Sequence, residues 1–307
     1  MKHLYPSYYE KFRCIAAACP DSCCQGWDVV IDEKTEAFYN SVKGDFGDKL
    51  RNAIYTDPDG DRVFRLADEK KCPFWGDDKL CDIYRTLGEE HLCLTCAMFP
   101  RITMDYTTFA EHTLALACPE AARLILAGDH AYNCFDATEF DPCEAYDAEI
   151  MSFLLQTREE AARILASDQP LEQRLRDLLG FADRVQKELT GESSAFDTSA
   201  LPEIYGDLEY IDEDNRSLVI SSVIGSPDLS VHERELTNLA LYYLYRYYLG
   251  AIDSLDILAP VRFSVCSVRV IAALSRHRDI TAAAQLYSKE IEQSYENMER
   301  LTEALGL

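Results

Sequence analysis

The chain has 307 residues, enough for one large domain or two ordinary ones, and 48% of them are apolar, which is ample for a buried core. Its formal charge of −24 argues against nucleic acid and anionic membrane surfaces as partners, because phosphate binding needs clustered Lys and Arg. An acidic field attracts cationic groups, such as a lysine side chain or a sulfonium cofactor, although solubility is the plainer explanation for it.

The opening stretch MKHLYPSYYEKFRC lacks the apolar segment of a secretory signal. The longest apolar run, LALYYLYRYYLGAI, is too short to span a membrane and is interrupted by Arg246. We therefore expect a cytoplasmic protein without a membrane partner. Thiols stay reduced in that compartment, so a cysteine cluster is expected to bind metal or to act in catalysis rather than to form disulfides.

Nine of the twelve cysteines lie in the first 118 residues, a density close to that of cysteine scaffolds. Their spacing is C-x4-C-x3-C-C from 14 to 24 and C-x8-C-x11-C-x2-C-x21-C from 72 to 118. Thiolates bind zinc or iron because soft sulfur matches these ions, and closely spaced pairs reach one ion at a small cost in chain entropy. The sequence therefore predicts metal ligands at Cys14, Cys19, Cys23, Cys24, Cys72, Cys81, Cys93, Cys96 and Cys118.

Burial as an apolar side chain is the alternative fate of a cysteine, since this residue is common in protein cores. We prefer that alternative for Cys134, Cys143 and Cys266, which lie outside the closely spaced groups. Adjacent side chains diverge from the backbone. Cys23 and Cys24 are therefore expected to serve two sites, or to divide between ligation and packing.

Composition and periodicity indicate a mainly α fold, with a cysteine-rich, metal-stapled N-terminal domain at 1–130 and an α-helical C-terminal domain at 143–307. Amphipathic periods predict helices at 144–166 and 170–190. The stretch 191–230 contains many turn residues and only one short apolar run, which favours a small strand pair or a mobile loop.

The last 75 residues have the pattern of a three-helix block. The first of these helices is apolar on most faces and is expected to be central to its domain; its main stripe comprises Leu236, Leu239, Ala240, Tyr243, Leu244, Tyr247 and Tyr248. The final helix is expected to carry Tyr287, Ile291, Tyr295, Met298 and Leu305 along one side, with Glu290, Glu292 and Glu296 beside them.

The pieces CPDSCCQGW, CPFW, LCDIYRTLG, LCLTCAMFPR and LACPEAARLIL resemble, in the same order, the flagellin lysine-N-methylase family. The first domain of that family is similar to small zinc- or iron-chelating proteins. The resemblance is concentrated in residues 1–130, and QLYSKEIEQSYEN is similar to the closing helix of the family. The family often has His where this chain has Gln293, so this chain has no imidazole at that position.

The resemblance implies a protein-lysine N-methyltransferase that acts on flagellin and takes its methyl group from S-adenosylmethionine. It also implies an iron–sulfur centre of the 4Fe–4S type, whereas the spacing alone does not separate iron from zinc. The shared pattern covers eight of the nine cysteines, and Cys93 is additional. Eight thiols are enough for two four-thiolate sites, or for one cluster with structural thiols.

Methyl transfer to a lysine requires a neutral amine, and deprotonation costs roughly 4 to 5 kcal/mol at neutral pH for a group with a pKa near ~10.4. An aromatic pocket with a nearby carboxylate or tyrosine lowers that cost. The candidate catalytic residues are Tyr243, Tyr247, Asp253 and Glu292, with Glu290 as a substitute for Glu292. The alternative is that these tyrosines only fill the core.

No Gly-rich strand-to-helix turn is present in the sequence, which leaves the donor-binding site unlocated. This absence motivates a second hypothesis, a non-enzymatic metal-binding adaptor of the flagellar or secretion system with a structural zinc or iron–sulfur site. A zinc hydrolase is a weaker third, because the sequence has no His-rich or mixed His and carboxylate ligand set.

Overall fold

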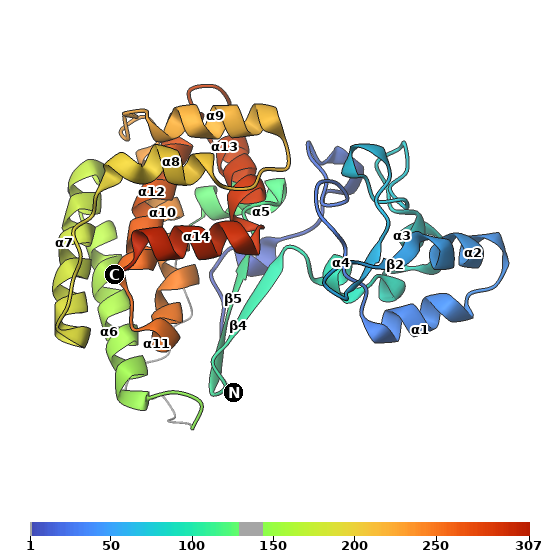
Figure 1. The fold of residues 1–307 in the computed structure, drawn as a ribbon, viewed down its shortest axis with the longest axis horizontal. Helices are drawn as coiled ribbons and strands as arrows, with labels where there is room; N and C mark the ends of the chain where they lie inside the picture. Colours follow the sequence, from blue (N-terminus) through green and yellow to red (C-terminus); the bar gives the residue numbers. More distant parts are fainter. Residues whose placement is uncertain (1, 129–143) are drawn as a thin grey trace. The chain divides into compact units, whose positions relative to one another are not determined.

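The computed structural model describes residues 2–128 and 144–307 and divides the chain into two compact units (Figure 1). The cysteine-rich unit comprises residues 13–102. The helical unit comprises the described residues of 1–12 and 103–307. The fold is mainly α, as predicted.

The boundary between the units differs from the expected position near residue 130. Residues 103–128 pack with the helical unit, because Leu114, Leu116, Ala121 and Ile125 belong to its hydrophobic core. The cysteine motifs therefore extend to Cys118, beyond the residue at which the cysteine-rich unit ends.

The cysteine-rich unit is built from short elements around a small core. They are α1 (Glu33–Ser41), α2 (Gly44–Ala53), β2 (Ile54–Thr56), β3 (Arg62–Phe64), α3 (Asp82–Leu87) and α4 (Leu94–Met98). Strands β2 and β3 form an antiparallel hairpin in which Ile54 lies opposite Phe64. Tyr39, Leu50 and Phe74 are fully enclosed against this hairpin, so the unit has a core of its own.

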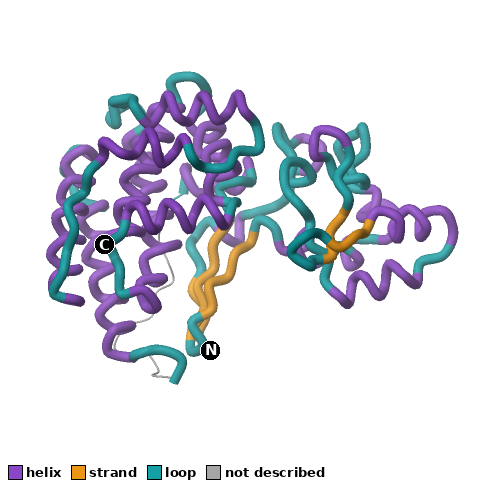
Figure 2. Tube along the Cα trace, in the orientation of Figure 1, coloured by secondary structure: helices purple, strands orange, loops and turns teal. Residues whose placement is uncertain are grey.

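A three-stranded sheet, in the order β1–β5–β4, stands beside the helices of the helical unit (Figure 2). Its strands are β1 (Lys2–Leu4), β4 (Arg101–Asp105), which leads out of the cysteine-rich unit, and β5 (Phe109–Leu114). Strand β1 is parallel to β5. Every residue of β5 is buried, so the strand lacks the alternating pattern of a half-exposed strand. For this reason the sequence did not predict β5.

Helices form the rest of the helical unit. They are α5 (Pro119–Ala127), α6 (Ala148–Leu165), α7 (Leu171–Thr190), α8 (Leu201–Gly206), α9 (Glu213–Val223), α10 (Glu233–Tyr247), α11 (Ala251–Ser254), α12 (Leu258–Leu274), α13 (Ile280–Tyr287) and α14 (Tyr295–Leu305). Helix α10 is buried on several faces, as expected, but α12 is more enclosed, because all of its residues except Pro260 and Arg269 are buried. None of the described helices combines the length and apolar character that crossing a bilayer requires.

The helices predicted at 144–166 and 170–190 are confirmed as α6 and α7. Asp147 caps α6, because its carboxylate accepts hydrogen bonds from the first-turn N–H groups of Glu149 and Ile150. Gly191 ends α7 in the left-handed conformation that favours glycine. Local signals therefore set both helices.

The prediction of a strand pair or loop at 191–230 was wrong, because this stretch contains α8 and α9. Asp212 caps α9, and Glu213 and Asp214 in the first turn favour the positive end of the helix dipole. Only two residues of α9 are buried, so its apolar period was too sparse to detect.

The expected single closing helix is also corrected, since the chain is broken between α13 and α14. A π-helical turn, Ser288–Glu292, follows α13, and Ser294 then caps α14 by accepting a hydrogen bond from the N–H of Asn297. Single π turns are frequent at functional sites. This turn carries both Glu290 and Glu292.

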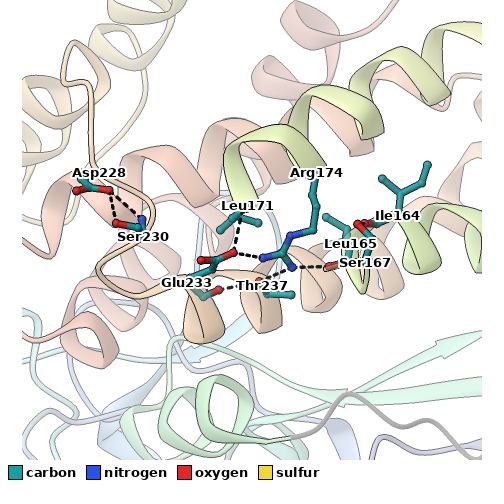
Figure 3. A network of polar contacts seen from close by, with 9 residues as sticks. All are labelled: Ile164, Leu165, Ser167, Leu171, Arg174, Asp228, Ser230, Glu233 and Thr237. Carbon is teal, nitrogen blue, oxygen red and sulfur yellow. Dashed lines mark hydrogen bonds and ion pairs between the residues drawn. The ribbon is translucent and has the colours of Figure 1, made fainter. Parts of the chain in front are cut away.

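Arg174 ties three helices together in the helical unit (Figure 3). Its Nη1 donates to the carbonyl of Leu165 at the end of α6 (2.6 Å) and to Oγ1 of Thr237 in α10 (3.0 Å). Its Nη2 bonds Glu233, which also accepts the N–H of Leu171 at the start of α7. The Arg174–Glu233 ion pair therefore satisfies groups at both ends of the α6–α7 connection.

Candidate functional site

Five cysteines gather in the cysteine-rich unit, namely Cys24, Cys72, Cys81, Cys93 and Cys96. Cys72 and Cys93 are buried, and the other three pack against the same core. Their thiols interact electrostatically with one another. The structure thus brings together side chains from positions as far apart as 24 and 96.

Backbone pairing brings the first two of these cysteines together. The N–H of Cys72 donates to the carbonyl of Cys24 (2.8 Å), and Gln25 pairs with Lys71 in an antiparallel bridge. Gly26 follows with a φ of +108°, a conformation that favours glycine. The backbone conformation of Gly26 therefore accompanies the pairing that brings Cys24 next to Cys72.

Two more of the cysteines begin helices. Cys81 is the N-cap of α3 and Cys93 is the N-cap of α4. The start of each helix therefore fixes the backbone of one cysteine of the cluster.

The thiols within the cluster differ in acidity. A hydrogen bond from Cys96 lowers the pKa of Cys93, and the same contact raises the pKa of Cys96. Burial raises the pKa of Cys72 to about 12. A hydrogen bond from Cys23, opposed by burial, lowers the pKa of Cys24 to about 7.

This last contact joins the vicinal pair, since the side chains of Cys23 and Cys24 hydrogen-bond each other. The division of the pair between two sites, or between ligation and packing, stays a prediction. Cys24 also receives a hydrogen bond at its N–H from Oγ of Ser22 (3.0 Å).

The remaining predicted ligands lie elsewhere. Cys14 is exposed and Cys19 is partly exposed, both on the segment before the vicinal pair, whereas Cys118 is the N-cap of α5 in the helical unit. Cys266 is buried in α12, as predicted. Cys134 and Cys143 lie outside the described residues. None of the ten described cysteines is in a disulfide.

The cysteines of this unit are candidate ligands for a metal ion. Five thiols in one patch suit a thiophilic ion such as zinc or iron, and two contacting pairs already exist, Cys23 with Cys24 and Cys93 with Cys96. Within 2–128 and 144–307, however, no three Cys, His, Asp or Glu side chains are placed so that they could hold one ion. The donor chemistry fits, and the positions of the sulfur atoms are not those of a preformed site.

Two further residues of this unit were missed by the sequence reading. Tyr39 is fully buried beside the cluster, and burial, followed by the nearby thiols, raises its pKa; its hydroxyl donates to the carbonyl of His91 (2.8 Å). Asp32 accepts the N–H of Leu94, the residue after Cys93. Neither has a motif around it that signals this position.

In the helical unit, the structure brings three of the four candidate catalytic residues together. The hydroxyl of Tyr243 donates to Oε1 of Glu292 (3.0 Å), and the hydroxyl of Tyr247 donates to Oε2 (2.9 Å). Burial raises the pKa of both tyrosines well above the usual range, so they remain hydroxyl donors. Nε of Arg246 lies 3.8 Å from Oε2 and completes the surroundings of this carboxylate.

Access to this network is limited. The side chain of Glu292 has no exposed surface, and Tyr243 is fully buried, whereas Arg246 and Tyr247 are partly exposed. Asp253 is exposed on α11 and does not contact Glu292 among the described hydrogen bonds and ion pairs. The carboxylate itself is enclosed, and of the residues that surround it Arg246 and Tyr247 reach the surface.

Glu290, on the same π turn, serves a different part of the unit. Its carboxylate accepts the N–H of Ile211 (2.7 Å) and Nδ2 of Asn215 (2.7 Å), and burial raises its pKa. It therefore fixes the start of α9 and is not part of the tyrosine network.

A buried ion pair joins Glu111 of β5 to Arg158 of α6. The two side chains are 1% and 2% exposed, and they meet through two parallel hydrogen bonds of 2.7 and 2.6 Å. The guanidinium also lies over the ring of Tyr245 at 4.7 Å. A charged residue inside the apolar run FAEHTLALA was the sequence signal for this pair.

Three relatives match this chain in alignments of 134 positions, each of which covers 39% of the chain. Two are the lysine-N-methylases of Salmonella typhimurium (strain LT2) and Salmonella choleraesuis (strain SC-B67), each 31% identical. The third is the flagellar biosynthetic protein FliU of Salmonella muenchen, which is 30% identical. The shared region covers 31% of each methylase and 75% of FliU.

No family model matches the chain, and no solved structure matches it. The chain spans only about a third of the length of the two methylases. It covers most of FliU at 30% identity. By this relationship, together with the order of its cysteine motifs, the chain belongs to the family of the lysine-N-methylases and FliU.

Proposed function

We propose that this protein is a protein-lysine N-methyltransferase that modifies flagellin in the cytoplasm with S-adenosylmethionine as the methyl donor. The observation that carries the proposal is its similarity, over 134 residues, to proteins named lysine-N-methylase. The name of FliU supports a flagellar setting for the reaction.

The charge of the chain suits a cationic substrate. Most of the formal charge of −24 comes from residues 1–12 and 103–307 of the sequence, where Asp and Glu outnumber Lys and Arg by 37 to 18. Such a field attracts a lysine-bearing surface and raises the encounter rate, with a strong dependence on ionic strength. The same negative field stabilises the protonated form of the lysine amine. A desolvated position, which favours the neutral form, is therefore still needed for the amine to lose its proton.

Tyr243, Tyr247 and Glu292 are the groups that we propose for this position. The two hydroxyls hold the carboxylate by one hydrogen bond each, which keeps Glu292 ready to accept a cation or a proton. Only Tyr247 and the neighbouring Arg246 reach the surface, so the amine would approach from their side. Asp253 has no part in this arrangement.

The cysteines of the cysteine-rich unit are proposed to hold an iron–sulfur cluster, with zinc as the alternative. The ligands would come from Cys24, Cys72, Cys81, Cys93 and Cys96, which share one patch, and such a centre would supply stability to a unit with a small core. Iron and zinc content, measured after purification without air, tests this proposal.

Substitutions sharpen that measurement. Cys96→Ser is expected to lower the metal content, while Cys266→Ser, a matched change of a buried thiol in the other unit, is expected to leave it unchanged. Cys23→Ser should also lose metal if the vicinal pair contributes a ligand. Equal metal content in all three variants would contradict the assignment.

A second candidate function is a metal-binding flagellar adaptor without enzymatic activity. The unequal coverage of the relatives favours it, because the matching region is 75% of FliU but 31% of the methylases. Incubation of the metal-containing protein with unmethylated flagellin and labelled donor separates the two functions. Label on flagellin lysines supports the enzyme, whereas stable binding without label supports the adaptor; flagellin with its lysines already blocked is the control.

A further inference from the structure

One carboxylate in the cysteine-rich unit holds the start of two helices. Asp32 is the N-cap of α1: its Oδ1 accepts the N–H of Thr35 (3.0 Å) and its Oδ2 accepts the Thr35 hydroxyl (2.8 Å). The same Oδ2 accepts the N–H of Leu94, the first residue of α4 (2.9 Å). These two helices are separated by more than fifty residues of sequence.

Helix α4 needs this outside partner. The first N–H groups of a helix have no partner within it, and the N-cap side chain ordinarily accepts one of them. In α4 the N-cap is Cys93, whose thiol contacts Cys96. The N–H of Leu94 is bonded by Asp32 from another segment, and Thr95 adds a second tie by donating its hydroxyl to the carbonyl of Val30 (2.8 Å).

We propose that Asp32 is the positioning residue of the Cys93–Cys96 pair. By accepting the N–H of Leu94 from another segment, it keeps the start of α4 closed, so that both thiols stay inside the cluster. The importance of this pair for catalysis rests on the proposed function, but its positioning does not.

Proline at position 94 tests the contact with little other disturbance. Leu94 is the first helical residue, where proline is tolerated, and Cys93 has φ −62° and ψ 158°, which suits a residue before proline. Leu94→Pro removes the N–H that Asp32 accepts. The side chain of Leu94 is 60% exposed, so Leu94→Ala is the matched control that shortens the side chain and keeps the N–H.

The readout is alkylation of individual cysteines by iodoacetamide in reduced, metal-free protein, followed by peptide mass spectrometry. Cys93 is 1% exposed, so it reacts only when this region opens. Loss of a hydrogen bond to a carboxylate is expected to speed labelling of Cys93 and Cys96 about ten-fold in Leu94→Pro. Labelling of Cys72, buried in the same unit, should keep its rate, which distinguishes positioning from general destabilisation.

Asp32→Ser provides an independent variant if the proline variant does not fold. Serine still caps α1, but its shorter side chain does not reach the N–H of Leu94. The same selective rise in labelling is expected. Unchanged labelling of Cys93 in either folded variant, or an equal rise at Cys72, overturns the proposal. Neither flagellin nor the methyl donor is present, so failure of the proposed function gives a different result, namely no methyl transfer with normal labelling.

Discussion

The two tyrosines that share Glu292 allow a quantitative test of the helical unit. Tyr243→Phe removes the donor to Oε1, and Tyr247→Phe removes the donor to Oε2. A hydrogen bond to a charged group contributes about 1.5 to 3 kcal/mol to stability. We expect Tyr243→Phe to fall within this range, and Tyr247→Phe near its lower end, because water reaches the partly exposed Tyr247.

The double variant is expected to lose more than the sum of the single losses. With both hydroxyls gone, the buried carboxylate keeps only Arg246, whose Nε lies 3.8 Å away. An enclosed charge without hydrogen bonds is costly, so the two positions are coupled.

Urea unfolding followed by far-UV circular dichroism is the suitable assay. Both tryptophans, Trp27 and Trp75, lie in the cysteine-rich unit, so fluorescence reports on that unit and helix content reports mainly on the other. Tyr295→Phe is the control, since this residue is 75% exposed and its loss should change the free energy of unfolding by less than about 0.5 kcal/mol. Losses below that value for Tyr243→Phe and Tyr247→Phe would refute the hydrogen-bonded network.

The same variants decide the role of the network in methyl transfer. If Glu292 receives the amine or its proton, each phenylalanine variant should transfer methyl groups more slowly under conditions in which it is fully folded. Full activity of a folded Tyr243→Phe variant would show that the tyrosines only fill the core.

Three further predictions concern other parts of the chain. The rate of Cys24 alkylation should have its pH midpoint near 7, because the thiolate is the reacting form and a hydrogen bond from Cys23 stabilises it. Cys23→Ala should move this midpoint up toward 9.0, whereas Cys23→Ser should not; an unmoved midpoint in the alanine variant would contradict the contact. Arg158→Met or Glu111→Gln should each lower the free energy of unfolding, measured in urea, by about 3 to 5 kcal/mol. The double variant Glu111→Leu with Arg158→Met should lose far less, and additive losses would be inconsistent with a buried pair. Gly191→Ala should lower the stability of the helical unit by about 1 kcal/mol, because φ is +82° although no atom obstructs a Cβ there; an unchanged melting temperature would contradict it.

Local sequence signals predicted the parts of the fold that depend on local structure. Helices α6 and α7 have strong amphipathic periods, an Asp cap at one end and Gly191 at the other. The sheet and helix α9 were not predicted, for opposite reasons. Strand β5 is buried at every position, whereas α9 buries only two residues, so neither has a clear apolar period. In both cases the surroundings, and not the sequence period, decided the conformation.

The candidate sites were predicted in part. The cysteine spacing predicted Cys72, Cys81, Cys93 and Cys96 among nine metal ligands without assigning them to one site, and tertiary pairing brings Cys24 to them. Spacing alone also placed Cys118 in the same group, whereas its backbone belongs to the helical unit. Likewise, Asp32 has no motif, because its contact with α4 depends on the folding of distant segments.

The two candidate sites belong to units that have separate hydrophobic cores. Substitution of a cluster cysteine should therefore affect metal content and the folding of residues 13–102 before it affects the tyrosine network. If such a variant also loses methyl transfer while Glu292 and its two donors remain folded, metal is needed for the reaction itself and not only for the stability of one unit. If transfer persists, the cluster is structural, and the chemistry depends on the helical unit.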